Sequence, residues 1–226
     1  MVMIKNMLLT NHNRPGKKIK KLKGIVIHWT ANTAAGADAV ANRNYFNTTG
    51  SYTSTHYIVD SKQIIRCIPD DEIGYHAGAS RYTELGNSIR EGNTSPNYYL
   101  LGIEMCVNKD GDWNKTYEAT VSLAAYLLKK HGLSVDGVYR HYDITGKGCP
   151  QMMLEEEPWN EFKSRVASQL LPVRIQINGK YLAVDAFIKD DRTYAPVRAI
   201  AGALGAEVDW DETRRTVLIT TKENKA

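Results

Sequence analysis

The chain has 226 residues, of which 42% are hydrophobic and 24% are charged, and its formal net charge is +4 at pH 7. This composition is typical of a globular protein with one or two domains. No run approaches the roughly 18 apolar residues that a membrane-spanning helix needs. The first residues also lack the apolar core and small-residue cleavage site of a signal peptide. We therefore expect synthesis in the cytoplasm and no insertion into a membrane.

The first 23 residues carry basic side chains and no acidic one. Such a stretch suits nucleic acid or an anionic wall polymer, and a solvated loop ahead of the first strand explains it as well. Because the whole chain is only weakly basic, we favour the loop and expect no nucleic-acid partner. The basic residues are Lys5, Arg14, Lys17, Lys18, Lys20, Lys21 and Lys23.

Alternating strand and helix patterns predict an α/β domain over residues 1–171, with a central, mostly mixed β-sheet flanked by helices. The apolar runs 24–29 and 100–107 suit buried strands. Apolar residues at helical spacing predict an amphipathic helix over 116–131, capped by Gly132. The other expected elements are helices over 38–46 and 159–171, a hairpin of strands 56–60 and 64–68, a short strand over 138–141, a surface loop over 79–98 and a polar loop over 142–150.

The last segment, residues 172–226, begins after Pro172 ends the preceding helix and has a different pattern. Alternating residues around the turn Asn178-Gly179 predict a hairpin. Pro196 opens a short helix, and two further strands follow. We expect a small α+β module in the order strand, strand, helix, strand, strand.

Three side chains offer the ligand chemistry of a zinc site. Zinc takes about four nitrogen or sulfur ligands and leaves one position to water when the site is catalytic. His28 and His141 each end a predicted strand, and Cys149 follows in a glycine-rich loop that can fold back. A histidine at a strand end is more often a core or hydrogen-bonding residue, so the spacing by itself leaves this reading open.

The other cysteines and histidines compete with this set. Three cysteines cannot all pair within one chain. Cys67 and Cys106 are most simply small core residues, although a disulfide between them stays open. His56 and His76 have four readings: metal ligand, support for a ligand, substrate contact or internal hydrogen bonding. We expect both to lie outside the set of metal ligands.

Five segments together resemble the type-2 N-acetylmuramoyl-L-alanine amidases, a family that includes peptidoglycan recognition proteins and phage amidases. The resemblance runs from about residue 8 to residue 170, and the motifs come in the family's order. The last motif, in which Lys147 and Cys149-Pro150 follow His141, is the most specific. The segments are 24–32, 55–60, 75–78, 101–104 and 141–150.

The resemblance implies one Zn²⁺ ion held by His28, His141 and Cys149, with Glu104 as general base and Lys147 beside the reacting carbonyl. It implies hydrolysis of the amide bond between N-acetylmuramic acid and L-alanine, with peptidoglycan as the partner. A carboxylate inside an apolar strand is costly unless it faces a polar cavity or a partner, which agrees with the role given to Glu104. A glutamate on a wet strand face and a solvated loop lysine are the structural alternatives.

The candidates for substrate contact are Trp29, Thr55 and His76. One position departs from the family pattern. Many relatives carry a catalytic tyrosine immediately before the histidine that corresponds to His56, and Thr55 occupies that position here. The resemblance therefore leaves more of the catalysis to Glu104.

The C-terminal segment is similar to the small copper-amine-oxidase N-terminal-like domains, through residues 177–180, 192–200 and 204–210. It contains neither His nor Cys, so we expect no metal there. We expect cell-wall binding or a contact between copies of the chain, with an inert spacer as the alternative. An amidase with such a module resembles a phage endolysin, which acts on the wall after release from the cytoplasm.

Two other functions stay open at this stage. One is a peptidoglycan-binding recognition module without catalysis, although Cys149, whose loss usually accompanies that state, is present. The other is a zinc peptidase acting on the stem peptide, or an amidase acting on a soluble wall fragment. The choice of scissile bond rests on the resemblance.

Overall fold

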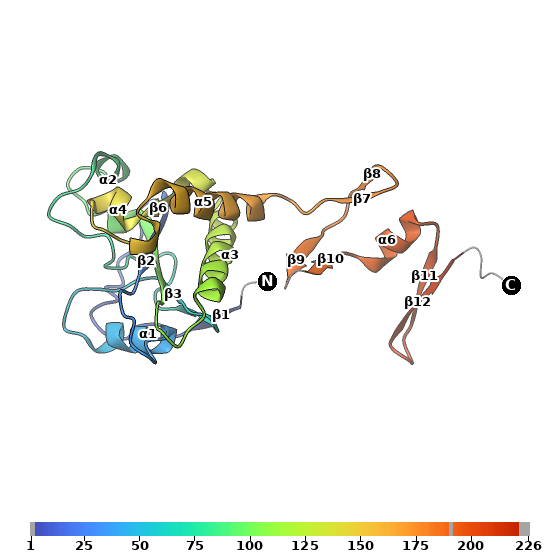
Figure 1. The fold of residues 1–226 in the computed structure, drawn as a ribbon, viewed down its shortest axis with the longest axis horizontal. Coiled ribbons are helices and arrows are strands. Elements are labelled where there is room, and N and C mark those ends of the chain that lie inside the picture. The colour runs from blue at the N-terminus through green and yellow to red at the C-terminus, as the bar shows by residue number, and fades with distance from the viewer. Residues whose placement is uncertain (1–2, 190–191, 222–226) are drawn as a thin grey trace. The chain divides into compact units, whose positions relative to one another are not determined.

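The computed structural model describes residues 3–189 and 192–221, and the chain divides into two compact units between Leu170 and Leu171. The first unit is built around a mixed six-stranded sheet with the strand order β1-β4-β3-β5-β2-β6 (Figure 1). Every neighbouring pair is parallel except β3 and β4. The strands are β1 (Ile4–Asn6), β2 (Gly24–Trp29), β3 (Tyr57–Val59), β4 (Ile64–Arg66), β5 (Leu100–Met105) and β6 (Val138–Arg140).

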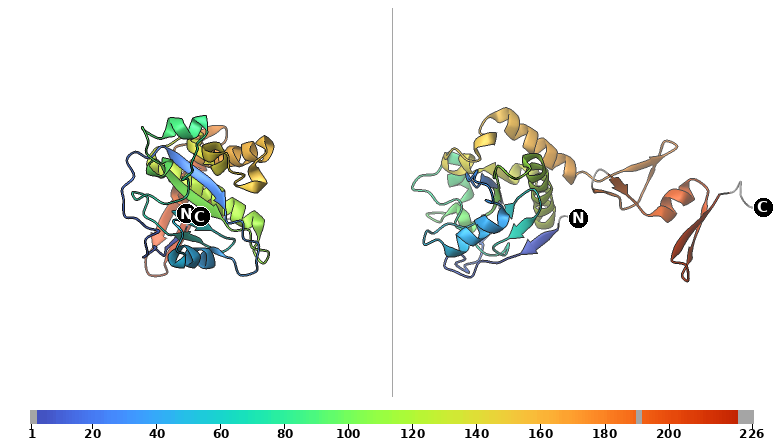
Figure 2. Two further views of the ribbon diagram at one scale, coloured as in Figure 1. Left: turned by 90° about the vertical axis from the view of Figure 1, so that its left-hand side faces the viewer. Right: turned by 60° about the horizontal axis from the view of Figure 1, so that its bottom comes forward.

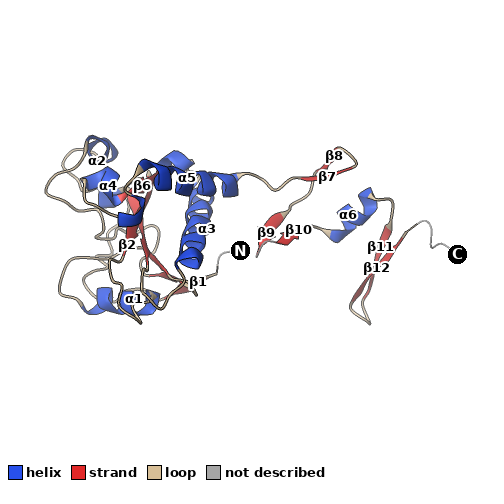
Figure 3. Ribbon diagram, viewed as in Figure 1, coloured by secondary structure: helices blue, strands red, loops and turns tan. Residues whose placement is uncertain are grey.

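Helices cover both sides of this sheet (Figures 2 and 3). Asp38 and Asp112 accept hydrogen bonds from the first turns of α1 and α3, and Gly132 ends α3 with a φ of 66°, as its sequence position predicts. The helices are α1 (Ala39–Thr48), α2 (Glu84–Ile89), α3 (Trp113–His131), α4 (His141–Thr145) and α5 (Glu156–Leu170), with 3₁₀ turns η1 (Pro96–Tyr98), η2 (Val135–Gly137) and η3 (Gln151–Met153).

The two faces of the sheet bury different clusters because side chains alternate along each strand. Ile25 and Ile27 of β2 pack with α3 and α5, as do Leu101 and Ile103 of β5. Val26 packs instead with side chains of α2 and α4, and α1 covers Ile58 of β3. His28 and Glu104 have the parity of the second set, so they lie on the face covered by α1, α2 and α4.

Regular structure also forms where the sequence predicts loops. The expected surface loop over 79–98 contains α2 and η1, and the expected polar loop over 142–150 begins with α4. The helices α2 and α4 form for one reason, which is that they pack against each other. Tertiary contact stabilises helices that are too short to be recognised by their periodicity. Strand β1 was also not expected from the sequence, and it joins the sheet edge beside β4.

In its described residues, the second unit has three antiparallel pairs of strands and one helix. The predicted turn Asn178-Gly179 has both φ angles positive, at 50° and 78°, as a two-residue hairpin turn requires. The sequence did not reveal the pair of β9 and β10. Residues 222–226 of the predicted module lie outside the described residues. The elements are β7 (Ile175–Ile177), β8 (Lys180–Leu182), β9 (Phe187–Lys189), β10 (Arg192–Tyr194), α6 (Val197–Ala203), β11 (Glu207–Asp211) and β12 (Thr216–Thr220).

The structure answers the question that the sequence left open about two cysteines. Cys67 and Cys106 are free thiols in the buried cluster beneath α1. Among the described residues, no helix is both long enough and apolar enough to cross a membrane.

A buried carboxylate joins the end of α3 to the sheet. Asp70 accepts hydrogen bonds from Lys130 at 2.7 Å, from His131 at 3.0 Å and from the hydroxyl of Tyr57. Burial by itself would raise the pKa of Asp70, but these bonds and the charge of Arg66 outweigh it and lower the pKa to about 2. The ionised form of Asp70 therefore stabilises the folded chain.

We predict that Asp70→Asn lowers the free energy of unfolding by about 2 kcal/mol at pH 7. A carboxyl group whose pKa is lowered by folding stabilises the folded state at pH values above the pKa that the group has in the unfolded chain. This contribution is lost as the pH falls from about 4 to about 2, so parent and variant converge there. Urea unfolding across this pH range measures both effects. Asp71→Asn, which removes an exposed partner of Lys18, is the control and changes little. An equal deficit at every pH would contradict the prediction.

Candidate metal centre

Three elements bring His28, His141 and Cys149 to one edge of the sheet. His28 is the fifth residue of β2, and His141 directly follows β6 as the first residue of α4. Strands β2 and β6 are parallel neighbours, with Ile27 opposite Arg140. Because the carboxyl ends of parallel strands meet at one edge, the two histidines lie close together although 113 residues separate them.

Local hydrogen bonds return Cys149 to His141. Gly146 ends α4 in the left-handed conformation, with a φ of 76°, which reverses the chain. The backbone N–H of Tyr142 then donates to the carbonyl oxygen of Cys149 at 2.9 Å. The buried guanidinium of Arg140 stabilises this loop by donating hydrogen bonds to the carboxylate of Asp143 at 2.8 Å and to the carbonyl oxygen of Leu154 at 2.7 Å. The loop is thereby closed on the second histidine.

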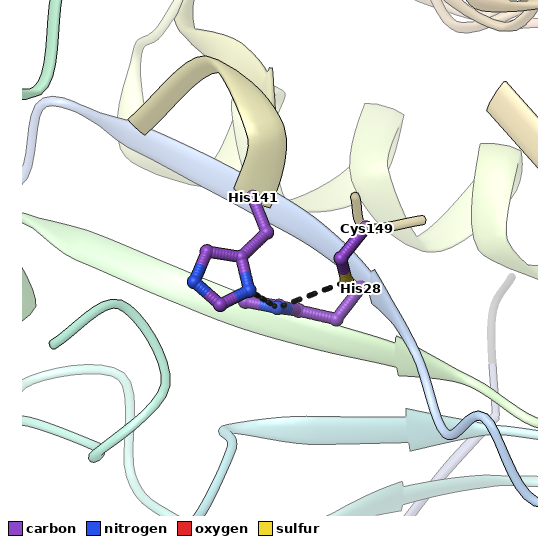
Figure 4. A group of neighbouring side chains, drawn as sticks. All are labelled: His28, His141 and Cys149. Atoms are coloured by element: carbon purple, nitrogen blue, oxygen red, sulfur yellow. Dashed lines mark hydrogen bonds between the residues drawn. The ribbon is translucent and has the colours of Figure 1, made fainter. Parts of the chain in front are cut away.

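The three side chains form a compact, buried donor set (Figure 4). Nδ1 of His28 lies 3.1 Å from Nδ1 of His141 and 3.8 Å from Sγ of Cys149, and the three ligand atoms all lie within 4.8 Å of one another. A tetrahedral ion with usual zinc bond lengths separates two nitrogens by about 3.3 Å and a nitrogen from a sulfur by about 3.5 Å. The residues present therefore fit a metal ion.

Glu104 lies beside this cluster. In the parallel pairing of β2 with β5, Glu104 is the register partner of His28, so both side chains project to the same face. Its Oε2 is buried and has no hydrogen-bond partner in the described structure. Burial raises the pKa of Glu104 to about 8, and the charge of Lys147 acts in the opposite direction. An unpartnered carboxyl oxygen of this kind is available for a reacting group.

Lys147 is exposed in the loop between His141 and Cys149. Burial, and after it the charge of Lys147, together lower the pKa of His141 to about 4. The charge of Lys147 also lowers the pKa of Glu104, against the effect of burial.

Two family models match the chain. Residues 18–152 match the model described as N-acetylmuramoyl-L-alanine amidase, and residues 176–226 match the copper amine oxidase N-terminal domain. This chain belongs to the N-acetylmuramoyl-L-alanine amidase family. The first match contains all three residues of the donor set together with Glu104 and Lys147.

Similar amidases occur in Bacillus. A probable N-acetylmuramoyl-L-alanine amidase of Bacillus licheniformis is 41% identical over 174 residues, covering 74% of this chain and 48% of its own length. The amidase BlyA of Bacillus subtilis (strain 168) is 33% identical over 209 residues, covering 89% and 54%. The chain thus spans about half the length of these curated relatives.

Solved structures match the amidase unit. A mutant endolysin from Bacillus subtilis is 37% identical, with a TM-score of 0.63 over 74% of this chain and 99% of that one. The catalytic domain of XlyA is 35% identical, with a TM-score of 0.63 over 73% and 99%. The amidase fold is therefore shown, and the expected fold class is confirmed.

His76 supports a ligand of this amidase centre. Its Nε2 lies 3.2 Å from the carbonyl oxygen of Leu100, which can only accept, so Nε2 carries the proton. Burial lowers the pKa of His76 well below its ordinary value, so the ring is neutral and Nδ1 is an acceptor. Nε2 of His28, 3.1 Å away, then donates to it. This chain of bonds leaves Nδ1 of His28 unprotonated toward His141 and Cys149.

The other residues that the sequence singled out near the centre are His56, Thr55 and Trp29. His56 donates from Nε2 to the carbonyl of Glu72 at 2.8 Å and accepts the N–H of Gly102 at 3.0 Å, so both ring nitrogens are used internally. Thr55 has no exposed surface, and its hydroxyl has no partner in the described structure. Trp29 is half-buried at the end of β2. Substrate contact by Thr55, Trp29 and His76 stays a prediction.

Two supporting residues were not found from the sequence. Arg140 fastens the loop of Cys149, as described above. Gly102 gives His76 room: a Cβ at Gly102 would lie 2.8 Å from Cγ of His76 and 2.8 Å from Oγ1 of Thr55. The glycine inside the Leu101-Gly102-Ile103-Glu104 motif is a signal for such close approach.

We predict that His76→Ala lowers the affinity of the amidase for a divalent transition-metal ion by about 10- to 100-fold, because His28 then loses the acceptor that fixes its tautomer. His76→Asn keeps an acceptor oxygen near the Nδ1 position and should retain affinity within a few fold. Competition with a chelator measures both, and exposed His12→Ala is the control. Equal affinities for the Ala and Asn variants would contradict this role.

Proposed function

We propose that this protein is a zinc-dependent N-acetylmuramoyl-L-alanine amidase that hydrolyses the bond between N-acetylmuramic acid and L-alanine in peptidoglycan. One observation carries the proposal: a two-histidine, one-cysteine donor set with metal-site spacing stands beside an unpartnered carboxyl in a chain of the amidase family. The endolysin-like structures that match the amidase unit support it further.

The chemistry of the donor set supports zinc as the ion. Two imidazole nitrogens and one thiolate suit Zn²⁺, and three protein ligands leave a fourth position open, as in catalytic zinc sites. When bound, zinc would polarise the amide carbonyl and make water a usable nucleophile near pH 7. His28, His141 and Cys149 would hold one ion.

Glu104 and Lys147 would carry the proton transfer and the charge stabilisation. Glu104 takes a proton from the attacking water and returns it to the departing alanine nitrogen, for which a carboxyl pKa near neutrality is suited. Lys147 lies two residues before Cys149, and its ammonium group stabilises the oxyanion that develops during attack. Loss of such a donor typically lowers the rate by about a hundred- to thousandfold.

The alternatives receive less support. A recognition module that binds peptidoglycan without catalysis does not need a complete set of metal ligands. It also does not need a partly buried glutamate with an unpartnered oxygen beside them. A peptidase acting on the stem peptide would use the same centre, and the bond that is cut distinguishes it from an amidase.

The second unit is proposed to bind the cell wall, with 1–171 as the catalytic domain and 172–226 as the module. Aromatic rings that stack on sugars are exposed in it, at 68% for Tyr181, 51% for Phe187 and 45% for Trp210. As in endolysins, the enzyme would be made in the cytoplasm and act on the wall after release. A contact between copies of the chain through this module stays a prediction.

Digestion of purified peptidoglycan tests the proposed function. We predict new alanine amino termini, lost with a zinc chelator and restored by added Zn²⁺, because hydrolysis needs the metal held by the three ligands. New reducing sugar ends would show a glycosidase, and new amino termini of other residues would show a peptidase. Wall binding without new ends of any kind would favour the recognition module.

We predict that Glu104→Gln retains bound zinc and its fold but loses turnover by about a hundredfold or more, because the amide cannot accept the proton. The measurements are metal content, thermal unfolding and release of alanine amines. Glu118→Gln, which changes a half-exposed glutamate paired with Arg165, is the matched control. Full activity in folded Glu104→Gln would remove Glu104 from the mechanism.

We predict that a chain ending at residue 171 retains hydrolysis of a soluble muropeptide but is depleted several-fold from sedimented cell walls relative to the full chain. The shortened chain is a fair test because the matched catalytic domain of XlyA was solved as a separate unit. Equal sedimentation of both forms would argue against wall binding by the module.

A further inference from the structure

A cavity of about 470 Å³ lies between α3 and α5, which pack against each other (Figure 1). These helices cover the face of the sheet that buries Ile25 and Ile27, whereas His28 and Glu104 project from the opposite face. Binding sites for small ligands usually have volumes of about 300 to 1,000 Å³. The cavity is therefore large enough for a ligand, and the sheet separates it from the metal centre.

Two aromatic side chains of α3 line the cavity. Trp113 and Tyr117 lie one helical turn apart on the same side of α3, and their ring centroids are 6.1 Å apart. The ring of Tyr117 packs edge-to-face on the buried ring of Phe162, at 5.5 Å, which fixes its position. Trp113 is 36% exposed at the start of the helix. Together the two rings offer a rigid apolar surface to a ligand.

Two further side chains complete the apolar part of the lining. Met152 comes from η3, and Pro158 comes from the start of α5. Aromatic faces suit the apolar C–H face of a sugar ring, and the adaptable thioether of Met152 suits the methyl group of an N-acetyl substituent. The apolar lining therefore has the chemistry of a site for an N-acetylated sugar.

The charged groups of the lining are two carboxylates and one guanidinium. Arg165 forms an ion pair with Glu118 at 2.6 Å and lies over the ring of Tyr117 at 5.6 Å, so its charge is already compensated. Glu161, whose side chain is 66% exposed, lies 3.9 Å from Arg165. Asn114 adds an amide that both donates and accepts. An anion would be repelled by the carboxylates, whereas sugar hydroxyl groups can donate to Glu161 and bond to Asn114.

We propose that this cavity is an auxiliary site for a neutral sugar chain, which stacks on Trp113 and Tyr117 and bonds to Asn114 and Glu161. The glycan strands of peptidoglycan supply such a chain, and this choice of ligand rests on the proposed function. Because the sheet separates the two sites, a strand bound here leaves the metal centre free. The site therefore keeps the amidase unit on the wall between successive cleavages.

A neutral tetramer of N-acetylglucosamine tests the site without hydrolysis. The chain ending at residue 171 is used, because it lacks the exposed aromatic rings of the second unit. Trp113→Ala should weaken tetramer binding about tenfold, since one stacking ring is lost. Trp113→Tyr keeps a ring and should stay within about threefold of the parent. The matched control is Tyr126→Ala, which removes a 41% exposed ring of α3 that does not line the cavity. Isothermal titration calorimetry measures all four affinities.

The same shortened chains test whether the site is used during hydrolysis. On sedimented peptidoglycan, Trp113→Ala should release alanine amines several-fold more slowly than the parent, because a second contact with the wall raises the effective substrate concentration. On a soluble muropeptide the two rates should be equal, since no second contact is needed there. An equal loss on both substrates would assign Trp113 to the fold or to the metal centre and overturn the auxiliary site.

Three binding results would also overturn the proposal. They are no tetramer binding by the parent, equal binding by Trp113→Ala, and self-association of the chain that depends on Trp113 and occurs without sugar binding. The last result, measured by sedimentation velocity, would assign the cavity to a contact between copies. Should Trp113→Ala not fold, Glu161→Ala carries the test and should weaken tetramer binding several-fold.

Failure of the proposed function is recognised separately. A parent chain that binds the tetramer through Trp113 but hydrolyses no muropeptide contradicts the amidase activity and supports the sugar site. A parent chain that hydrolyses the muropeptide but does not bind the tetramer supports the amidase activity and contradicts the sugar site.

Discussion

The parallel pairing of β2 with β5 is the constraint on which the centre depends. It places His28 level with Glu104 and turns both toward α1, α2 and α4, while Ile27 and Ile103 enter the core. A slip of one residue in this register would bury the polar pair beneath α3 and expose the apolar set. The apolar burial that stabilises the sheet therefore also fixes the distance between a metal ligand and the proposed base.

Burial gives the groups of the centre their protonation states. Desolvation lowers the histidine pKa values and raises that of Glu104, because low polarity disfavours every charged form. Neutral imidazoles are the forms that bind metal. The carbonyl of Leu100 then sets the tautomer of His76 and, through it, that of His28. A backbone oxygen of the sheet thus selects which nitrogen of His28 faces the other ligands.

The face of the sheet opposite α3 carries the candidate functional residues of the first unit. The donor set and the unpartnered carboxyl oxygen of Glu104 share it, and α4 with the loop that follows supplies His141 and Cys149. The long segment before β5, which contains α2, packs on this face. Its asparagine and threonine side chains hold backbone positions that have no strand or long helix to fix them, as in many binding loops.

The sequence by itself determined the α/β pattern, the strands that carry His28 and Glu104, the α3 cap at Gly132 and, through the family motifs, the candidate ligands. These features depend on local periodicity, turn chemistry and residue type, which a single chain displays directly. Only the tertiary structure decided the rest. Helices α2 and α4 are stabilised by each other, and His76 bonds to a residue 48 positions away. Contacts of this kind depend on how distant segments pack, and no local pattern encodes that packing.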